Sequence, residues 1–541
     1  MPFIPANPLD HLLGGPVPDP MEDRSLTGPA QFRAFLGGAL AGVVAALAMT
    51  TLQLVLRLTV GLATTPELVG DRMAAAITIA TFGDLIRFAG GYNELKQLGV
   101  ISVLIGQLLV GAGIGGAAAL IATRMGARRS TAFVIGATVV LWVATVVLLW
   151  PTLATHFNGL PSSVSRPVTM IGLGIVYATF AIVLLVLRRR SGRDVVEGTA
   201  SASPSRVDRR TVITAGVGVG LLVASGSLLE RLKAKATFSY DGTRVDGPDI
   251  GAITPNDRFY VVTKNIVDPG VDPGLWRLDI AGLVERPQTF DFAAFKALPA
   301  VDQETTLMCI SNPVGGGLMS NAVWRGVRVA DLLQTAGVGA TAVEVLCHAV
   351  DGYTDTIPIA KALESTTLLA YQMNGEPLPG RHGYPVRLLV PGMYGEKSLK
   401  WIDRIEVVDR DVKGFYEQQG WGPDFVIPTR SRFSGPDLRQ PLAAGRPVHL
   451  VGQAFAGNRG VASVDVSQDG GATWTPATID YAGTELTWAL WSFDWTPTQA
   501  GEYKLAVRAT DRTDAVQSSA ERAIAPEGAR GLHQVTAKVA G

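Results

Sequence analysis

Cysteine is scarce in this chain of 541 residues, which contains only Cys309 and Cys347. The two residues do not form a CxxC pair, and their number excludes a zinc ribbon, a dithiol redox motif and covalent haem attachment. Cys347 lies in an alternating strand pattern, so we expect it in the core. An oxidising compartment would permit a Cys309–Cys347 disulfide, which we do not favour because it would consume the thiolate of Cys309.

Charge is also scarce, and it is balanced. Lys and Arg number 47, Asp and Glu number 47, and the formal net charge is zero. A chain without a basic excess lacks the electrostatic footprint of a nucleic-acid-binding protein, so nucleic acid is not an expected partner. Charged residues make up 17% of the chain and hydrophobic residues 47%. This composition indicates membrane segments.

Long runs without charge fill the first 230 residues. Five runs reach the roughly 20 residues that cross a bilayer core, at residues 33–56, 98–122, 131–150, 167–187 and 211–229. Apart from Arg33, none holds Lys, Arg, Asp, Glu or His, so a bis-histidine haem and an ion pathway are not expected there. We interpret residues 33–229 as a five-span α-helical membrane domain, an anchor or docking platform in contact with membrane lipid.

Arginine-rich connections set the predicted orientation. They lie at residues 124–129 and 188–190. Because basic connections stay inside, we predict a cytoplasmic tail over residues 1–32 and an extracytoplasmic chain after about residue 230. Arg209-Arg210, before the fifth run, is open to two interpretations: an internal twin-arginine export signal or a plain positive-inside anchor.

The connection over residues 57–97 would lie outside the cytoplasm in this orientation. It carries four basic and four acidic residues, so its charge does not bear on the orientation. We expect residues 73–88 to form a short interfacial helix.

The sequence Gly111-Ala112-Gly113-Ile114-Gly115-Gly116 satisfies the GxGxxG pattern. It lies inside an apolar run, without a preceding soluble strand and without an acidic residue downstream. Close packing between membrane helices therefore explains these small residues better than dinucleotide binding.

After residue 230 the chain reads as ordinary globular sequence. Strand-like alternation and short helical patterns occur at residues 276–283, 292–297, 329–336, 342–347 and 385–390. This mixture predicts an α+β catalytic domain over residues 245–410.

A different pattern begins at about residue 441. Short alternating strands, separated by turn signals such as Asp469-Gly470-Gly471, predict an immunoglobulin-like β-sandwich over residues 441–525. Residues 411–440, rich in Gly, Pro and aromatics, are expected to connect the two soluble domains. Residues 526–541 are expected to form a tail.

Cys309 stands out by its position. It lies near the end of an alternating run, Thr305–Ile310, and the turn residues Ser311–Gly317 follow at once. A thiolate at such a point can reach an open pocket and is a good ligand for a transition metal. The alternative is a small buried hydrophobic residue, which is the commonest role of an unpaired cysteine.

Three blocks of the soluble region resemble the sulfite oxidase family of molybdopterin-dependent oxidoreductases, and in particular its membrane-anchored bacterial members. Residues 382–401 match the family pattern HGxPxR…PG…G…KW, and residues 464–474 match its VDISLDGGxxW strand pair. Cys309 stands in a CxSNxxGG context. The resemblance covers about residues 250–520 and implies a molybdopterin-binding domain followed by an immunoglobulin-like, dimerisation-type domain.

The resemblance also implies how the molybdenum–molybdopterin cofactor is held. Cys309 matches the protein thiolate that binds molybdenum beside the pterin sulfurs, and is thus the expected metal ligand and catalytic residue. The residues expected to bind the cofactor are Tyr260, Val261, Asp351, His382, Arg387, Ser398, Leu399 and Lys400. Taken singly, each has an ordinary structural explanation. As an ordered set they indicate the cofactor.

Two departures from the family pattern bear on the substrate. Phe259–Lys264 contains no arginine where sulfite oxidases have one in an FFxRNH motif, and the nearest counterpart of their active-site tyrosine is Trp421. An oxyanion such as sulfite needs several cations around it. Arg325, Arg430 and Arg432 are candidates to compensate, but sulfite is not the favoured substrate.

The function implied is a membrane-anchored, extracytoplasmic oxidoreductase. It would transfer an oxygen atom on a small-molecule substrate and exchange two electrons with a membrane-bound cytochrome or a quinone-linked partner, since the chain offers no haem ligands. The alternatives are reduction of an S-oxide or N-oxide with the same cofactor, and a cofactor-free membrane receptor or scaffold. A homodimer is a further expectation from the immunoglobulin-like domain.

Overall fold

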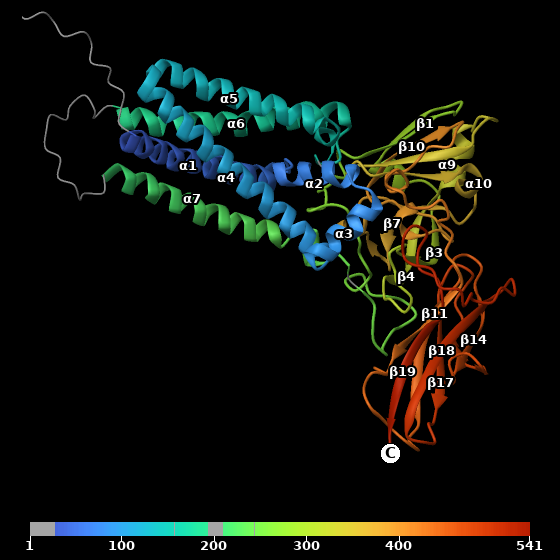
Figure 1. Ribbon diagram of the computed structural model, residues 1–541. Coiled ribbons are helices and arrows are strands. Elements are labelled where there is room, and N and C mark those ends of the chain that lie inside the picture. The colour runs from blue at the N-terminus through green and yellow to red at the C-terminus, as the bar shows by residue number, and fades with distance from the viewer. Residues whose placement is uncertain (1–27, 156, 193–208, 243) are drawn as a thin grey trace, which may run out of the picture.

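The computed structural model describes residues 28–155, 157–192, 209–242 and 244–541. These residues form a helical bundle, an α+β domain beside its end, and a β-sandwich that extends away from both (Figure 1). Most of the predicted N-terminal tail lies outside the described residues. So do the side chains of Arg209 and Arg210, on which the export prediction depends.

The bundle consists of long helices packed around α1. Its elements are α1 (Gly28–Val60), α2 (Thr65–Ala76), α3 (Ile79–Ala89), α4 (Tyr92–Met125), α5 (Ala127–Leu148), the 3-10 turn η1 (Trp150–Ala154), α6 (Ser162–Gly192) and α7 (Arg209–Lys233). Helix α1 packs against α4, α6 and α7. Within the described residues, α1, α4, α5, α6 and α7 are each long and apolar enough to cross a membrane, which agrees with the five predicted spans.

Glycines bring α1 and α4 into close contact. A Cβ atom on Gly42 of α1 would collide with the backbone oxygen of Gly111 of α4, and one on Gly38 would collide with that of Gly115. Small residues allow two helix backbones to approach in this way. The GxGxxG sequence is therefore a helix-packing motif, as predicted.

The connection between α1 and α4 differs from its prediction. The single helix expected over residues 73–88 is two helices, α2 and α3. Ile77 is extended between them (φ −96°, ψ 131°), and the Thr78 side chain accepts the backbone N–H of Thr81. A threonine that caps a new helix interrupts the previous one because its own backbone is non-helical.

The α+β domain contains two sheets. Its elements are β1 (Arg277–Gly282), β2 (Gln288–Asp291), α8 (Phe292–Lys296), β3 (Val301–Met308), β4 (Met319–Arg328), α9 (Val329–Ala336), β5 (Glu344–Ala349), β6 (Thr354–Pro358), α10 (Ile359–Ala362), β7 (Leu368–Met373), β8 (Glu376–Pro377), β9 (Arg387–Leu389) and β10 (Ile402–Val408). One sheet has the order β2-β1-β10-β5-β6, with β1 parallel to β10; the other has the order β3-β4-β7-β8, with β9 beside β7. Cys347 is buried in the first sheet, as expected.

The β-sandwich packs a sheet of order β11-β13-β17-β16 on a sheet of order β12-β19-β18-β14-β15. Its strands are β11 (Arg430–Gly435), β12 (Leu442–Ala443), β13 (Val448–Phe455), β14 (Val461–Ser467), β15 (Thr475–Pro476), β16 (Thr478–Tyr481), β17 (Ala489–Trp495), β18 (Gly501–Asp511) and β19 (His533–Ala540). Strands β11 and β19 come from residues assigned to the connection 411–440 and the tail 526–541. They complete sheets whose other strands lie between them in sequence, and local patterning does not reveal such pairing.

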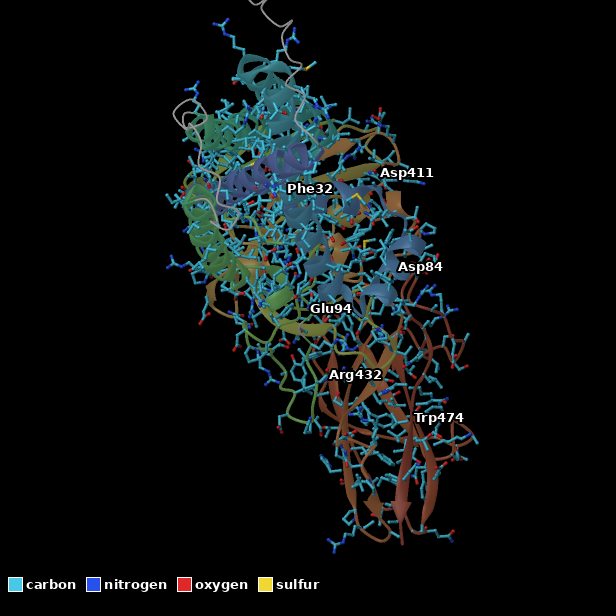
Figure 2. All side chains as sticks on the ribbon, turned by 60° about the vertical axis from the view of Figure 1, so that its left-hand side comes forward. Phe32, Asp84, Glu94, Asp411, Arg432 and Trp474 are labelled. Carbon is cyan, nitrogen blue, oxygen red and sulfur yellow. The ribbon has the colours of Figure 1, made fainter. Side chains whose placement is uncertain are left out.

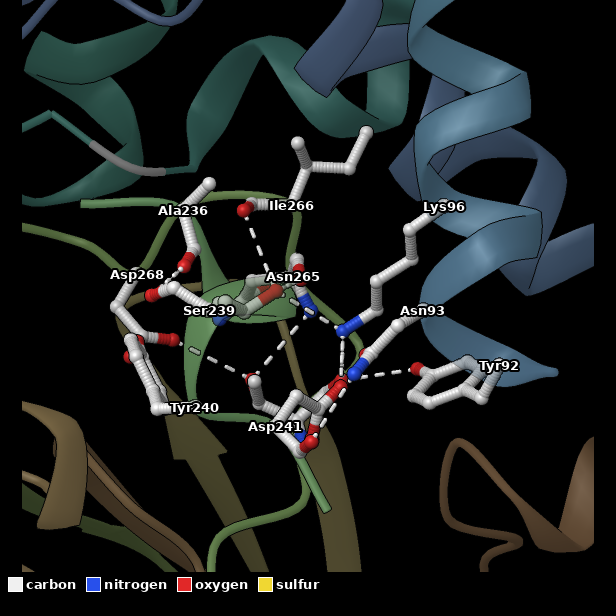
Figure 3. A network of polar contacts seen from close by, with 12 residues as sticks. Tyr92, Asn93, Lys96, Ala236, Ser239, Tyr240, Asp241, Asn265, Ile266 and Asp268 are labelled. Carbon is white, nitrogen blue, oxygen red and sulfur yellow. Dashed lines mark hydrogen bonds and ion pairs between the residues drawn. The ribbon is translucent and has the colours of Figure 1, made fainter. Parts of the chain in front are cut away.

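The bundle and the α+β domain are joined by buried polar contacts as well as by the chain (Figure 3). Lys96 of α4 donates to the hydroxyl of Thr237 (3.0 Å) and to the carbonyl of Thr263 (2.7 Å), and it pairs with Asp241. Lys264 lies between Asp71 of α2 and Asp351. Because buried charges are stable only when paired, these contacts fix one domain against the other.

Candidate functional site

Cys309 directly follows β3, where the chain leaves the second sheet. Its backbone N–H donates to the carbonyl of Leu318 (3.0 Å), and its Sγ lies 3.0 Å from the hydroxyl of Ser311. Burial raises the pKa of the thiol to about 11, against the lowering effect of the Ser311 hydrogen bonds. The free side chain is therefore a neutral thiol near pH 7, and a bound metal would have to displace its proton.

A cavity of about 340 Å³ opens beside this thiol. The structure brings every predicted site residue to its wall: Cys309, Tyr260, Val261, Asp351, His382, Arg387, Ser398, Leu399 and Lys400. These residues come from separated parts of the chain. Their convergence on one cavity follows from the tertiary fold and not from sequence proximity.

Arg387, in β9, is a buried cation of the cavity wall. Its Nη1 donates to the carbonyl of His382 and its Nη2 to the carbonyl of Ser398, both at 3.1 Å. Burial lowers the pKa of the guanidinium to about 10, so it stays charged at neutral pH. Its Nε is buried and has no hydrogen-bond partner among the described residues. An unpaired charged donor at a cavity wall suits an anionic group such as a phosphate.

His382 lies at the same end of the cavity. Its Nε2 is 2.8 Å from the carbonyl of Asn256, so this nitrogen carries the hydrogen. Burial lowers the pKa of the imidazole to about 3, and the charges of Arg387 and Lys400 add to the effect. The side chain is therefore neutral at physiological pH and contributes hydrogen bonding without charge.

Ser398 and Lys400 complete the group around Arg387. The Ser398 hydroxyl accepts the backbone N–H of Val390 (3.1 Å), and Lys400 donates to the carbonyl of Arg381 (3.2 Å). Burial lowers the pKa of Lys400. This set of two cations and a fixed backbone forms a cradle for a group with negative charge.

Tyr260 and Asp351 line the cavity in different ways. The backbone N–H of Tyr260 donates to the hydroxyl of Ser320 (3.0 Å). The Asp351 carboxylate accepts from Asn265 (3.0 Å) and from the backbone of Tyr353 (3.0 Å). Asp351 thus organises the loops around the cavity through bonds that already engage both carboxylate oxygens.

The sequence prediction missed one wall of the cavity. Phe82 and Ile86 of α3 and Tyr92 of α4 line it, although they belong to the part interpreted as an anchor. Glu396 also lines it; its Oε1 is shielded and has no hydrogen-bond partner among the described residues. Burial raises the pKa of Glu396 well above its usual range. The expectation of an interfacial helix over residues 73–88 was the available signal that this segment would lie at one end of the bundle.

The three arginines considered as replacements for missing cations lie elsewhere. Arg325 pairs with Asp302 on the surface (2.9 Å), Arg430 donates to the carbonyl of Pro313 (2.8 Å), and Arg432 lies in the sandwich (Figure 2). None of them lines the cavity. Arg325 is held on the surface by Asp302, and Arg430 and Arg432 belong to strand β11 of the sandwich. Trp421, in contrast, does line the cavity.

Comparisons with known proteins agree with this geometry. The oxidoreductase molybdopterin binding domain matches residues 265–416, and the Mo-co oxidoreductase dimerisation domain matches residues 427–526. The uncharacterized oxidoreductase YuiH of Bacillus subtilis is 34% identical over 186 residues, which cover 34% of this chain and 92% of that protein. The chain therefore belongs to the sulfite oxidase family of molybdopterin-dependent oxidoreductases.

Two other similarities are partial. Human mitochondrial sulfite oxidase is 33% identical over 305 residues, which cover 47% of this chain and 55% of the human protein. The chain thus spans about half the length of that relative. The solved structure of the sulfane dehydrogenase SoxCD from Paracoccus pantotrophus aligns with 54% of this chain and 84% of its own, at 24% identity and a TM-score of 0.46.

The residues present fit a molybdopterin cofactor. The thiol of Cys309 offers a soft ligand, and the unpaired Nε of Arg387 offers a buried donor for a phosphate. Among the described residues there is no group of three His, Cys, Asp or Glu side chains that could hold a metal by themselves. A metal at Cys309 would thus take its other ligands from the cofactor.

Proposed function

We propose that this protein is a membrane-anchored, extracytoplasmic oxidoreductase that transfers an oxygen atom on a small molecule and exchanges two electrons with a separate redox partner. The observation that carries the proposal is the single cavity in which the Cys309 thiol meets the cradle of His382, Arg387, Ser398 and Lys400. A scaffold without a cofactor would have no need of this set.

The protein's own residues have defined tasks in this function. Cys309 would hold the metal, and Arg387 and Lys400 would neutralise the cofactor phosphate. Neutral His382 would accept a hydrogen bond at Nδ1, because its Nε2–H already donates to the carbonyl of Asn256. The bound molybdenum supplies the oxygen-transfer and two-electron chemistry, while the chain binds, orients and shields the cofactor. The reverse direction, reduction of an S-oxide or N-oxide, uses the same groups and is the second candidate.

The arrangement of charge supports the predicted orientation. Arg188 of α6 donates to the carbonyl of Ser130 of α5 (3.4 Å), so the two arginine-rich connections lie together. They are at the end of the bundle far from the α+β domain (Figure 1). With basic connections on the cytoplasmic side, the cavity lies on the other side. The dimerisation-type domain is the surface on which a homodimer would form.

The test is molybdenum content per chain, measured on protein from a host that makes the pterin. We expect about one molybdenum for each wild-type chain, since one thiolate binds one metal. Cys309→Ser should lose the metal and stay folded. Cys347→Ser, which changes the buried cysteine of β5, should retain it. Well-folded wild-type protein without metal, from a host with an active pterin pathway, would reject the proposal and favour the scaffold.

A further inference from the structure

The membrane domain builds part of the cavity that contains Cys309. Phe82 and Ile86 of α3 and Tyr92 of α4 form this part, which we call the helical wall. None of the three belongs to the set expected to hold the cofactor. The bundle thus does more than anchor the catalytic domain, because its side chains face the same space as the metal-binding thiol.

The helical wall is held in place by specific contacts. The Tyr92 hydroxyl donates to the carbonyl of Thr263 (2.8 Å), and the Phe82 ring packs edge-on against the Tyr92 ring at 5.6 Å between centroids. The ammonium of Lys96 lies 4.4 Å from the centre of the Tyr92 ring and donates to the same Thr263 carbonyl. A wall fixed in this way can select a ligand by shape, because little entropy is lost when a ligand binds a preformed surface.

The helical wall adjoins an aromatic loop of the catalytic domain. Ile79 of α3 packs on Gly420. A Cβ atom added to Gly420 would lie 3.4 Å from the Cγ2 atom of Ile79. Tyr416 and Trp421, on either side of Gly420, both line the cavity, with their rings 6.5 Å apart. Cys309 lines the same cavity, so this loop and the helical wall face the space beside the thiol.

The helical wall and this loop carry no cation. The other cations that line the cavity have partners: Lys264 pairs with Asp71 and Asp351, and Arg381, Arg387 and Lys400 donate to backbone carbonyls. The remaining Nε of Arg387 is assigned to the cofactor phosphate. Arg244 also lines the cavity but is exposed to solvent, where charge is screened. A small oxyanion would therefore find little compensation for its lost hydration beside α3.

We propose that Phe82, Ile86 and Tyr92 determine substrate specificity, and that the substrate is an uncharged molecule whose alkyl or aryl group packs against α3. The inference rests on the proposed function, since it assumes that the cavity holds the molybdenum cofactor. It adds the class of substrate and the part of the chain that selects this substrate.

The test compares two sulfoxide probes, methyl phenyl sulfoxide and dimethyl sulfoxide, on the molybdenum-loaded full chain in detergent. Each sulfoxide accepts two electrons, from two molecules of reduced viologen, and two protons, to give the thioether and water. We expect the phenyl probe to have the lower KM. Phe82→Ala and Ile86→Ala should each raise that KM roughly tenfold by removing buried apolar contact, with little change in kcat.

Phe88→Ala is the matched control. Phe88 lies on the same helix but is 81% exposed and does not line the cavity, so its removal should leave both KM values unchanged. A second readout avoids turnover: the molybdenum(V) electron paramagnetic resonance signal should shift on adding methyl phenyl sulfoxide to the wild type, and less in Phe82→Ala.

The outcomes separate the two proposals. Loaded enzyme that does not distinguish the probes, shows no spectral shift, or responds to Phe82→Ala as it does to Phe88→Ala would overturn the role of the helical wall and leave the cofactor assignment intact. A wild-type chain without molybdenum would instead reject the proposed function itself.

Discussion

Lys96, near the start of α4, forms a buried ion pair with Asp241, which lies just beyond the last helix of the bundle. The pair joins the start of α4 to the segment that leads from α7 into the α+β domain. Through Thr263, the same ammonium group fixes the loop that follows Tyr260 and Val261 on the cavity wall. The position of the helices therefore affects the geometry of the cavity.

Removing the charge of Lys96 should be strongly destabilising. In Lys96→Met the buried Asp241 carboxylate loses its partner, a change that costs about 3–5 kcal/mol in comparable buried pairs. We expect a clearly lower apparent melting temperature for the full chain in detergent. Lys96→Met combined with Asp241→Asn should recover part of the loss, since no unpaired charge remains.

Lys233→Met is the control for the Lys96 experiment. Lys233 forms an exposed pair with Glu230 (3.8 Å), and such pairs contribute about 0–1 kcal/mol. Equal effects of the two substitutions would contradict the view that the Lys96 contact joins the domains.

Arg387→Lys should weaken cofactor retention. Lysine keeps the positive charge but carries all its N–H donors on one nitrogen. It cannot reproduce the planar fork in which Nη1 and Nη2 bind separate carbonyls and Nε remains for a phosphate. We expect cofactor binding weaker on the order of tenfold, measured as molybdenum retained per chain after dilution and gel filtration. Arg325→Lys, at the exposed pair with Asp302, should retain the wild-type content. Unchanged retention in Arg387→Lys would remove Arg387 from the cofactor site.

Gly383→Ala should disturb the cradle by steric conflict. Gly383 has a φ of +114°, and an added Cβ would lie 3.0 Å from the Cβ of Arg387 and the Cα of Lys400. Gly375 in the β7–β8 turn also has a positive φ, of +79°, but has open space around its Cα. Both alanines introduce backbone strain, so only Gly383→Ala should also lower the molybdenum content. Similar losses in both would assign the effect to strain alone.

The stability of the sandwich should fall in acid because of His533. Burial, with the nearby charges of Arg432 and Arg430, lowers the pKa of His533 from 6.5 to about 4. Between these values the unfolded chain binds a proton that the folded chain does not. The stabilisation is therefore fully present above about pH 6.5 and is lost as the pH falls toward 4.

His533→Gln tests this dependence. The Nδ1 atom of His533 accepts the backbone N–H of Phe433 (3.0 Å), and the glutamine side-chain oxygen can accept a hydrogen bond without titrating. The melting temperature of the variant should thus change less than that of the wild type between pH 7 and pH 5. His449→Gln, an exposed change on β13, should follow the wild-type profile. An equally steep profile for His533→Gln would show that other groups control the acid response.

Local sequence was enough to predict much of the fold and the site. Charge-free runs gave the five candidate membrane helices, because about 20 apolar residues have few stable alternatives to a helix in a bilayer. The resemblance of residues 382–401 to a family pattern predicted His382, Arg387, Ser398 and Lys400 as cofactor-binding residues, and the same resemblance singled out Cys309 as the metal ligand. These motifs are contained in short stretches, so they can be recognised without the tertiary structure.

Only the tertiary structure decided which distant segments complete the sandwich and the cavity. Strands β11 and β19 close the sandwich from outside its predicted limits, and Arg325, Arg430 and Arg432 are held away from the cavity. Phe82, Ile86 and Tyr92 lie more than 200 residues before Cys309 in the sequence, yet face the same cavity. Contacts over such separations depend on how whole domains pack and on buried pairs such as Lys96–Asp241, and no local pattern encodes that packing.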